Sequence, residues 1–198
     1  MSDIDAKTVQ QLRKMTGAGM MDCKKALVEC EGDIEKAVDH LRKTGLAKAA
    51  KRMGREVNEG RIHQYIHPGA KLGVLLEVNC ETDFVARTDE FIGFCNDVAM
   101  HIAAEDPLAV SVEQLDKNLI EKEKEIYKEQ AKATGKPDNV IEKIVEGKMK
   151  KFYDETVLLR QPFVKDPDKS ISDILNEIIA KLGENIQINR FARFKIGE

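Results

Sequence analysis

The residues of this chain that could do covalent or metal chemistry are its four cysteines and four histidines. They are Cys23, Cys30, Cys80, Cys95, His40, His63, His67 and His101. No two cysteines form a C-x-x-C pair, and no histidine lies at ligand spacing beside them, so the pattern indicates no metal site. No histidine neighbours a serine or cysteine in a triad pattern, and the chain lacks a P-loop and a G-x-G-x-x-G motif. We therefore expect a protein that acts by binding, with no cofactor and no catalysis of bond making.

A binding role is suggested by the stretch Leu76–Arg87, which reads LEVNCETDFVAR. A strand pattern over Leu72–Val78 breaks at Asn79–Asp83, and the apolar run that follows starts a helix. A polar residue suits a helix start because it accepts bonds from the free N–H groups of the first turn, whereas a large ring beside it is less expected. Two interpretations stay open. Either Phe84 closes the core under the helix, or Asp83 and Phe84 form a tip that enters another protein.

Composition limits the class of protein that carries this stretch. With 198 residues, 42% hydrophobic and 34% charged, the chain is predicted to be globular and soluble, in one or two domains. Its net charge of −3 and its lack of tryptophan argue against direct nucleic-acid binding. There is no signal-peptide pattern and no apolar run long enough to span a bilayer, and Cys23 and Cys30 share one helical face as expected of buried free thiols. We expect a cytoplasmic protein without membrane contact.

The first part of the chain, residues 1–45, is predicted to be a small three-helix bundle. Apolar residues recur at spacings of three and four, and Thr16–Gly19 interrupts them as a turn. Asp33 is predicted to cap the third helix, which we expect to end at Gly45. Residues 46–59 follow as a basic helical linker.

The basic residues of that linker allow a second interpretation. Lys48, Lys51, Arg52 and Arg55 carry four positive charges with no acid before Glu56. Such a patch could contact RNA or a membrane, but four charges make a weak patch, and a solvated linker also explains them.

The remaining residues, 60–198, are predicted to form an α+β core. Alternation before and after His67–Gly69 predicts a β-hairpin, and a last strand that ends near Ile196 is expected to complete a three-stranded antiparallel sheet. Helices are predicted to pack beside the sheet. Residues 112–157 are predicted to form a projecting helical hairpin, because their apolar stripes are narrow and their other faces are charged; the alternative is ordinary packing on the core.

Several motifs together resemble the bacterial elongation factor Ts family. They are Leu12-Arg13, Thr16–Leu27 (TGAGMMDCKKAL), Leu76–Arg87, Val145–Phe152 (VEGKMKKF), Gln161–Phe163 and Arg193–Glu198 (RFKIGE). The resemblance covers essentially the whole chain in order. It implies a guanine-nucleotide exchange factor that acts in translation on elongation factor Tu, in its GDP-bound and nucleotide-free states. It also implies that the N-terminal bundle is ubiquitin-associated-like.

The resemblance also implies which residues meet the GTPase. Thr82, Asp83, Phe84 and Val85 would act on its magnesium site and displace the ion, which favours the partner-facing interpretation of Phe84. We therefore expect Phe84→Ala to slow exchange without unfolding the protein.

Two further contact regions are implied in the same way. Arg13, Met20 and Met21 would contact a helix of the GTPase; the alternative is that one methionine packs inside the bundle, and the helical stripe favours Met20. The segment Tyr65–Gly69 resembles the family's Tyr-x-His-x-Gly hairpin with an extra Pro68, which suggests His67 as a contact on another flank.

Longer members of the family hold two copies of the sheet-bearing core, whereas this chain shows one. We therefore expect a homodimer joined through the core. Two other classes stay open: a ubiquitin-like binding module that needs only residues 1–45, and an RNA-binding translation protein that uses the basic linker.

Overall fold

The structure is a computed structural model that describes residues 4–52, 54–133 and 135–197. The first three residues of the predicted bundle, residue 53 of the predicted linker and the final residue of the RFKIGE motif lie outside the described residues. The chain is mixed α+β, as predicted. None of the helices in the described part combines the length and the apolar composition that a membrane crossing requires.

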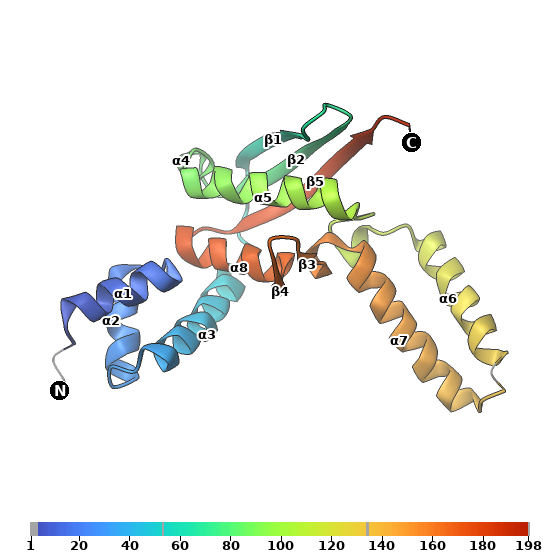
Figure 1. Cartoon of the computed structure of the whole chain (residues 1–198), viewed down its shortest axis with the longest axis horizontal. Helices are drawn as coiled ribbons and strands as arrows, with labels where there is room; N and C mark the ends of the chain where they lie inside the picture. Colours follow the sequence, from blue (N-terminus) through green and yellow to red (C-terminus); the bar gives the residue numbers. More distant parts are fainter. Residues whose placement is uncertain (1–3, 53, 134, 198) are drawn as a thin grey trace. The chain divides into compact units, whose positions relative to one another are not determined.

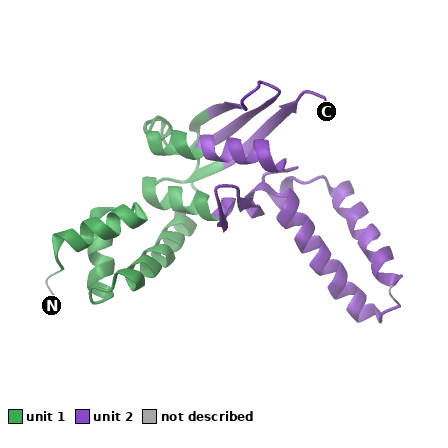
Figure 2. Ribbon diagram, in the orientation of Figure 1, with its two compact units in different colours: residues 1–61, 79–94, 173–187 green, residues 62–78, 95–172, 188–198 purple. Residues whose placement is uncertain are grey.

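The chain divides into two compact units that are each discontinuous in sequence (Figure 2). Unit 1 comprises Met1–Arg61, Asn79–Phe94 and Asp173–Gln187, and unit 2 comprises Ile62–Val78, Cys95–Ser172 and Ile188–Glu198. The predicted domain limits at residues 45 and 59 stay predictions.

Unit 1 contains the three predicted N-terminal helices, α1 (Ala6–Thr16), α2 (Met20–Glu29) and α3 (Ile34–Arg52). Gly17 ends α1 with a left-handed φ of 66°, and the Asp33 carboxylate accepts the Lys36 N–H at 3.1 Å at the start of α3. One buried cluster joins the helices, formed by Val9, Leu12, Cys23, Ala26, Leu27 and Ala37. Most residues of the apolar periodicity therefore face inward, although Met20, on the same stripe as Cys23 and Leu27, is 41% exposed.

The predicted end of the third helix at Gly45 is wrong, because α3 continues to Arg52. A glycine inside a helix costs only about 1 kcal/mol relative to alanine, so it does not have to end one. A Cβ atom placed on Gly45 would lie 3.4 Å from the Cβ of Ala180 in α8 (Ile171–Leu182). The glycine thus lets α8 approach α3 closely, which a single sequence does not reveal.

The sheet has the order β1-β2-β5 and is antiparallel, as predicted (Figure 1). Its strands are β1 (Glu59–Ile66), β2 (Leu72–Cys80) and β5 (Ile186–Lys195). Beyond the end of β5, the Ile196 N–H donates to the Lys71 oxygen at 2.9 Å.

The helix α5 (Asp89–Glu105) enters unit 2 at Cys95. Within unit 2 it contacts the sheet, where the Arg193 side chain of β5 donates to the backbone oxygen of Ala103 at 3.4 Å. Along β2, the buried side chains of Val74, Leu76 and Val78 alternate with the exposed side chain of Leu75. Because successive side chains of a strand point to opposite faces, Leu75 lies on the face opposite the buried residues.

The predicted helical hairpin consists of α6 (Lys117–Lys132) and α7 (Asp138–Thr156). Its buried residues Ala131, Ile141, Val145 and Met149 form a cluster of their own. Short elements precede and follow the hairpin in the sequence: η1 (Val112–Gln114) before it, and η2 (Leu158–Arg160), β3 (Pro162–Phe163) and β4 (Asp166–Ser170) after it.

A buried histidine joins elements of unit 2. His101 of α5 lies 3.0 Å from the Gln161 Oε1 atom through Nε2, and its Nδ1 accepts the Val164 N–H at 3.3 Å. The Gln161 side-chain amide in turn donates to the backbone oxygens of Glu105 and Glu155. Burial lowers the pKa of the imidazole more than these contacts raise it, so His101 is held neutral.

Candidate partner-binding site

The stretch that suggested a binding tip folds as a strand end followed by the single-turn helix α4 (Asp83–Ala86). Thr82 is its N-cap, and the Thr82 hydroxyl accepts the Val85 N–H at 3.4 Å. Phe84 is 76% exposed, whereas its neighbour Val85 is only 6% exposed. The interpretation of Phe84 as a core residue is therefore excluded, and Val85 holds the turn to its own unit.

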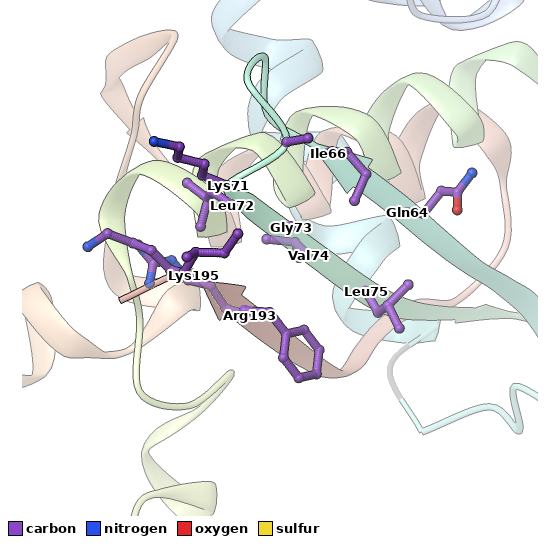
Figure 3. A pocket seen from close by; sticks show the side chains of 12 residues that line it. Gln64, Ile66, Lys71, Leu72, Gly73, Val74, Leu75, Arg193 and Lys195 are labelled. Atoms are coloured by element: carbon purple, nitrogen blue, oxygen red, sulfur yellow. The ribbon is translucent and has the colours of Figure 1, made fainter. Parts of the chain in front are cut away.

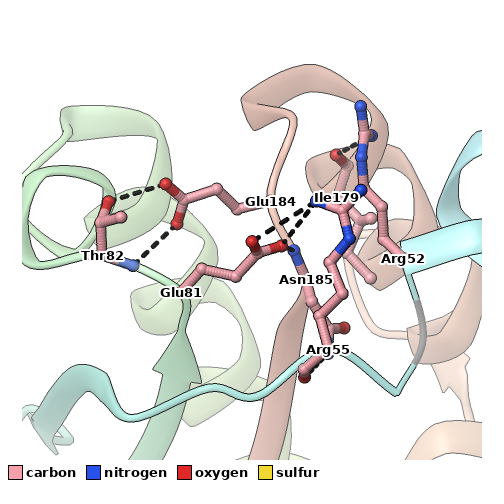
Figure 4. Close-up of polar contacts among 7 residues, drawn as sticks. All are labelled: Arg52, Arg55, Glu81, Thr82, Ile179, Glu184 and Asn185. Atoms are coloured by element: carbon pink, nitrogen blue, oxygen red, sulfur yellow. Dashed lines mark hydrogen bonds and ion pairs between the residues drawn. The ribbon is translucent and has the colours of Figure 1, made fainter.

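Thr82 is held by every polar group that it has. The Glu184 carboxylate accepts the Thr82 N–H at 3.0 Å and the Thr82 hydroxyl at 2.7 Å (Figure 4). The backbone oxygen of Thr82 accepts the Ala86 N–H at 3.3 Å and the Cys80 thiol at 3.1 Å. Burial, helped by the charge of Glu184, raises the pKa of the Cys80 thiol to about 11, so the proton needed for this bond stays in place.

A second carboxylate makes the reciprocal contact. Glu81 accepts the backbone N–H of Asn185 at 2.6 Å, and an Arg55 Nη1 atom lies 3.4 Å from the same carboxylate (Figure 4). The Asn185 side chain is buried and donates to the Arg55 oxygen at 2.8 Å. Glu184, just before β5, thus binds Thr82 at the start of the tip, and Glu81, just before the tip, binds Asn185, the residue directly before β5. We call these contacts of Glu81 and Glu184 the carboxylate clasp.

Sequence reasoning did not single out Glu81, Glu184 or Asn185. Glu81 lies inside the LEVNCETDFVAR motif, so the sequence did identify the segment that contains it. Nothing in a single sequence pairs Thr82 with Glu184, because 102 positions separate them.

Asp83, the acid of the tip, forms an ion pair with Arg87 one helical turn later, with 2.7 Å between Oδ2 and Nη2. Both side chains are largely exposed. Such surface pairs contribute about 0.3–0.5 kcal/mol, so a partner group can replace Arg87 at little cost.

The N-terminal candidates are also at the surface. Arg13 lies exposed in the last turn of α1, and Met20 and Met21 begin α2 with 41% and 66% of their surface exposed. The alternative that Met20 packs inside the bundle is wrong, because Cys23 and Leu27 fill the interior on that helix. Exposed methionines of this kind adapt well to a partner surface.

His67 lies exposed in the turn between β1 and β2, where its backbone N–H donates to the backbone oxygen of Leu72 at 2.9 Å. Its Nδ1 atom is 3.0 Å from the Tyr65 hydroxyl, which orients the ring. His67 belongs to unit 2, while Arg13, Met20, Met21 and the tip belong to unit 1.

The outer face of the sheet in unit 2 carries an exposed apolar patch, which we call the sheet-face patch. Its members are Ile62, Ile66, Leu75, Phe194 and Ile196. A groove crosses this region and is lined by residues of all three strands, among them Gln64, Gly73 and Phe194 (Figure 3). The basic residues Lys71, Arg193 and Lys195 also line this groove. Exposed apolar side chains gathered in this way indicate an interaction site.

The basic residues of the predicted linker are mostly engaged within unit 1. Lys48 pairs with Asp22 at 2.8 Å, Arg52 donates to the Ile179 oxygen at 3.1 Å, and Arg55 meets Glu81. These contacts compete with the phosphate binding that the RNA interpretation requires.

Potential metal ligands do not gather in the described part of the chain: His, Cys, Asp and Glu side chains form no group of three or more there that could hold an ion. All four cysteines are free thiols.

Comparison with known proteins matches residues 4–198 to the family model described as "Elongation factor TS". Elongation factor Ts of Geobacter sulfurreducens is 58% identical over 195 residues, which cover 98% of this chain and 90% of the relative. That of Desulfosudis oleivorans is 56% identical over 198 residues and the full length of both chains. That of Caldanaerobacter subterraneus is 58% identical over 98% of both.

Proposed function

The chain belongs to the elongation factor Ts family, and from this premise we propose that it is a guanine-nucleotide exchange factor for elongation factor Tu. It binds the GDP-bound GTPase, promotes loss of magnesium and GDP, and leaves the nucleotide-free form ready for GTP. The protein makes and breaks no covalent bond in this proposal. It works by binding energy alone.

The observation that carries the proposal is the exposure of Phe84 on a turn that is otherwise anchored. A side chain that leaves 76% of its surface in water contributes little to its own fold. It is available as an aromatic anchor for a partner, the kind of residue that dominates many interfaces.

The mechanism follows from what magnesium does in a GTPase. The ion bridges nucleotide phosphate oxygens and protein ligands, so its position depends on the loops that supply those ligands. Phe84 enters beside these loops and shifts them, while Asp83 exchanges Arg87 for polar groups of the partner. Loss of the ion leaves phosphate charge uncompensated, and GDP dissociates faster. Exchange factor and nucleotide each weaken the binding of the other, because coupling between two sites is reciprocal.

Two other surfaces supply affinity. Arg13, Met20 and Met21 dock against a helix of the GTPase, and His67, oriented by Tyr65, contacts it on another flank. Val85 takes part as the buried anchor of the tip.

The sheet-face patch supports a homodimer. A twofold interface brings the same patch of both subunits together, so it must be self-complementary. A face of aliphatic and aromatic side chains meets this condition, whereas a face dominated by one sign of charge would repel itself. We propose that the second copy covers Leu75 and Phe194, and that each dimer acts on two GTPase molecules.

The place of action follows from the partner. The protein works in the cytoplasm, without direct nucleic-acid or membrane contact, and the free thiols are suited to that reducing compartment.

The test is the release rate of a fluorescent GDP from elongation factor Tu, measured with increasing amounts of this protein at low and high magnesium. We expect a large acceleration by the wild-type protein, which Phe84→Ala reduces strongly to a smaller but measurable value. Val28→Ala is the matched control, because Val28 is another exposed apolar side chain of unit 1.

Acceleration that survives Phe84→Ala undiminished keeps the function and moves the mechanism to the N-terminal contacts or His67. No acceleration by the wild-type protein overturns the proposal, and a binding module without exchange activity then becomes the better description.

A further inference from the structure

We propose that the carboxylate clasp positions the Phe84 tip, so that Glu184 and Glu81 are positioning residues for nucleotide exchange. This inference rests on the proposed function and deepens it. It concerns residues outside Thr82–Val85 that act on the partner only through Phe84.

The first argument is that α4 cannot hold its own shape. It has four residues, and isolated helices of this length are unstable because one or two hydrogen bonds do not repay the ordering of the backbone. The direction of the exposed Phe84 side chain therefore depends on contacts that reach α4 from elsewhere.

The second argument is where those contacts attach. Glu184 binds both the backbone N–H and the hydroxyl of Thr82, the residue that caps α4. The hydroxyl donates to Glu184, and its oxygen remains oriented to accept the Val85 N–H. Glu184 thus fixes the cap that in turn fixes the turn bearing Phe84.

The third argument is that the clasp is anchored at its far end. The Glu81 carboxylate accepts the backbone N–H of Asn185, and the buried Asn185 side chain donates to the backbone oxygen of Arg55. Glu184 lies between Gly183, which ends α8 with a φ of 84°, and this buried Asn185. Its carboxylate is therefore attached to a well-held junction, which suits a group that orients another segment.

The Phe84 side chain must enter the GTPase in the productive geometry, because a displacement of about 1 Å can cost up to about a hundredfold in rate. Loss of the clasp leaves the docking surfaces of α1 and α2 intact. We therefore expect the maximal rate of GDP release to fall, while the concentration of exchange factor that gives half of that rate changes little.

The experiment compares wild type, Glu184→Gln and Glu184→Ala in the GDP-release assay, with Glu35→Ala as a control for loss of an exposed carboxylate in unit 1. The Gln side chain keeps one acceptor oxygen, so we expect its maximal rate to lie between those of wild type and Glu184→Ala. For Glu184→Ala we expect about a tenfold loss of maximal rate and less than about a twofold change in half-saturating concentration. Thermal unfolding of each variant shows whether it is folded. If Glu184→Ala is not folded, the maximal rate of GDP release with Glu184→Gln tests the inference instead.

A double variant separates positioning from a general structural role. If Glu184 acts through Phe84, Glu184→Ala has no further effect on the maximal rate in a Phe84→Ala background. Effects of the two substitutions that multiply, or folded Glu184 variants with the wild-type rate, overturn the inference and leave the proposed function intact. A wild-type protein without exchange activity overturns both.

Discussion

Phe84 and Val85 are consecutive in the chain, yet Phe84 leaves three quarters of its surface in water while Val85 is buried. The single helical turn that carries them directs one side chain outward and the other into unit 1. Phe84 is therefore available to contact a partner, while the buried Val85 side chain keeps the turn packed against unit 1.

The pair gives opposite expectations for folding. Phe84→Ala should change the free energy of unfolding by less than about 0.5 kcal/mol, as is usual for exposed positions. Val85→Ala should lower it by about 1–3 kcal/mol, because it removes buried methyl groups and leaves a cavity. Chemical denaturation of both variants measures this, and a larger loss for Phe84→Ala would restore its interpretation as a core residue.

The ion pair of the tip predicts different roles for its two members. Asp83→Asn should lower the maximal rate of GDP release, because the amide competes poorly for cationic or hydrogen-donating groups of the GTPase. Arg87→Ala frees the Asp83 carboxylate and should leave that rate at or above the wild-type value. Equal losses in both variants would show that Arg87 itself contacts the partner.

The N-terminal methionines should govern affinity. Met21→Ala should raise the half-saturating concentration in the release assay roughly five- to tenfold, equivalent to about 1–1.4 kcal/mol, with the maximal rate unchanged. Met15→Ala, which removes an exposed methionine of α1, serves as the control. A lowered maximal rate for Met21→Ala, at unchanged half-saturation, would speak against a pure docking role.

Introducing charge on the sheet-face patch should separate the proposed dimer. Across a twofold axis, Phe194→Glu places like charges in an apolar interface, which costs more than the contact contributes. Sedimentation equilibrium at micromolar concentration should give a dimer for wild type and for Leu108→Glu, an exposed position of unit 2 outside the patch, but a monomer for Phe194→Glu. A monomeric wild type would contradict the proposal.

His101 predicts that acid destabilises the protein before its carboxylates titrate. The unfolded chain binds a proton on this imidazole near its ordinary pKa of about 6.5, while the folded protein does so only at lower pH. The unfolded state therefore binds more protons below that pKa, and the free energy of unfolding falls as the pH decreases. Urea titrations between about pH 7 and about pH 5.5 should show this fall, and His101→Gln should show a shallower one. Parallel slopes would assign the pH dependence to other groups.

Much of this organisation was predictable from sequence because it is local. The apolar spacing of the N-terminal helices, the Asp33 cap and the alternation along β1 and β2 depend on residues a few positions apart. The strand-to-helix change at LEVNCETDFVAR is of the same kind. The error at the end of α3 has a physical origin: Gly45 was predicted to end a helix because its contact with Ala180 depends on a distant segment. The alternative that Met20 packs inside the bundle stayed open for the same reason, because the helical stripe does not show how deep the start of α2 lies.

The sequence by itself therefore determined the main helices and strands, apart from the end of α3, together with the family resemblance and the segment that carries the tip. Only the tertiary structure decided that Phe84 points into solvent, that Glu184 holds Thr82 from 102 positions away, and that an apolar face of the sheet stays uncovered. The physical reason is that periodicity and capping depend on chain neighbours, whereas exposure and the pairing of distant carboxylates depend on which segments the fold brings together.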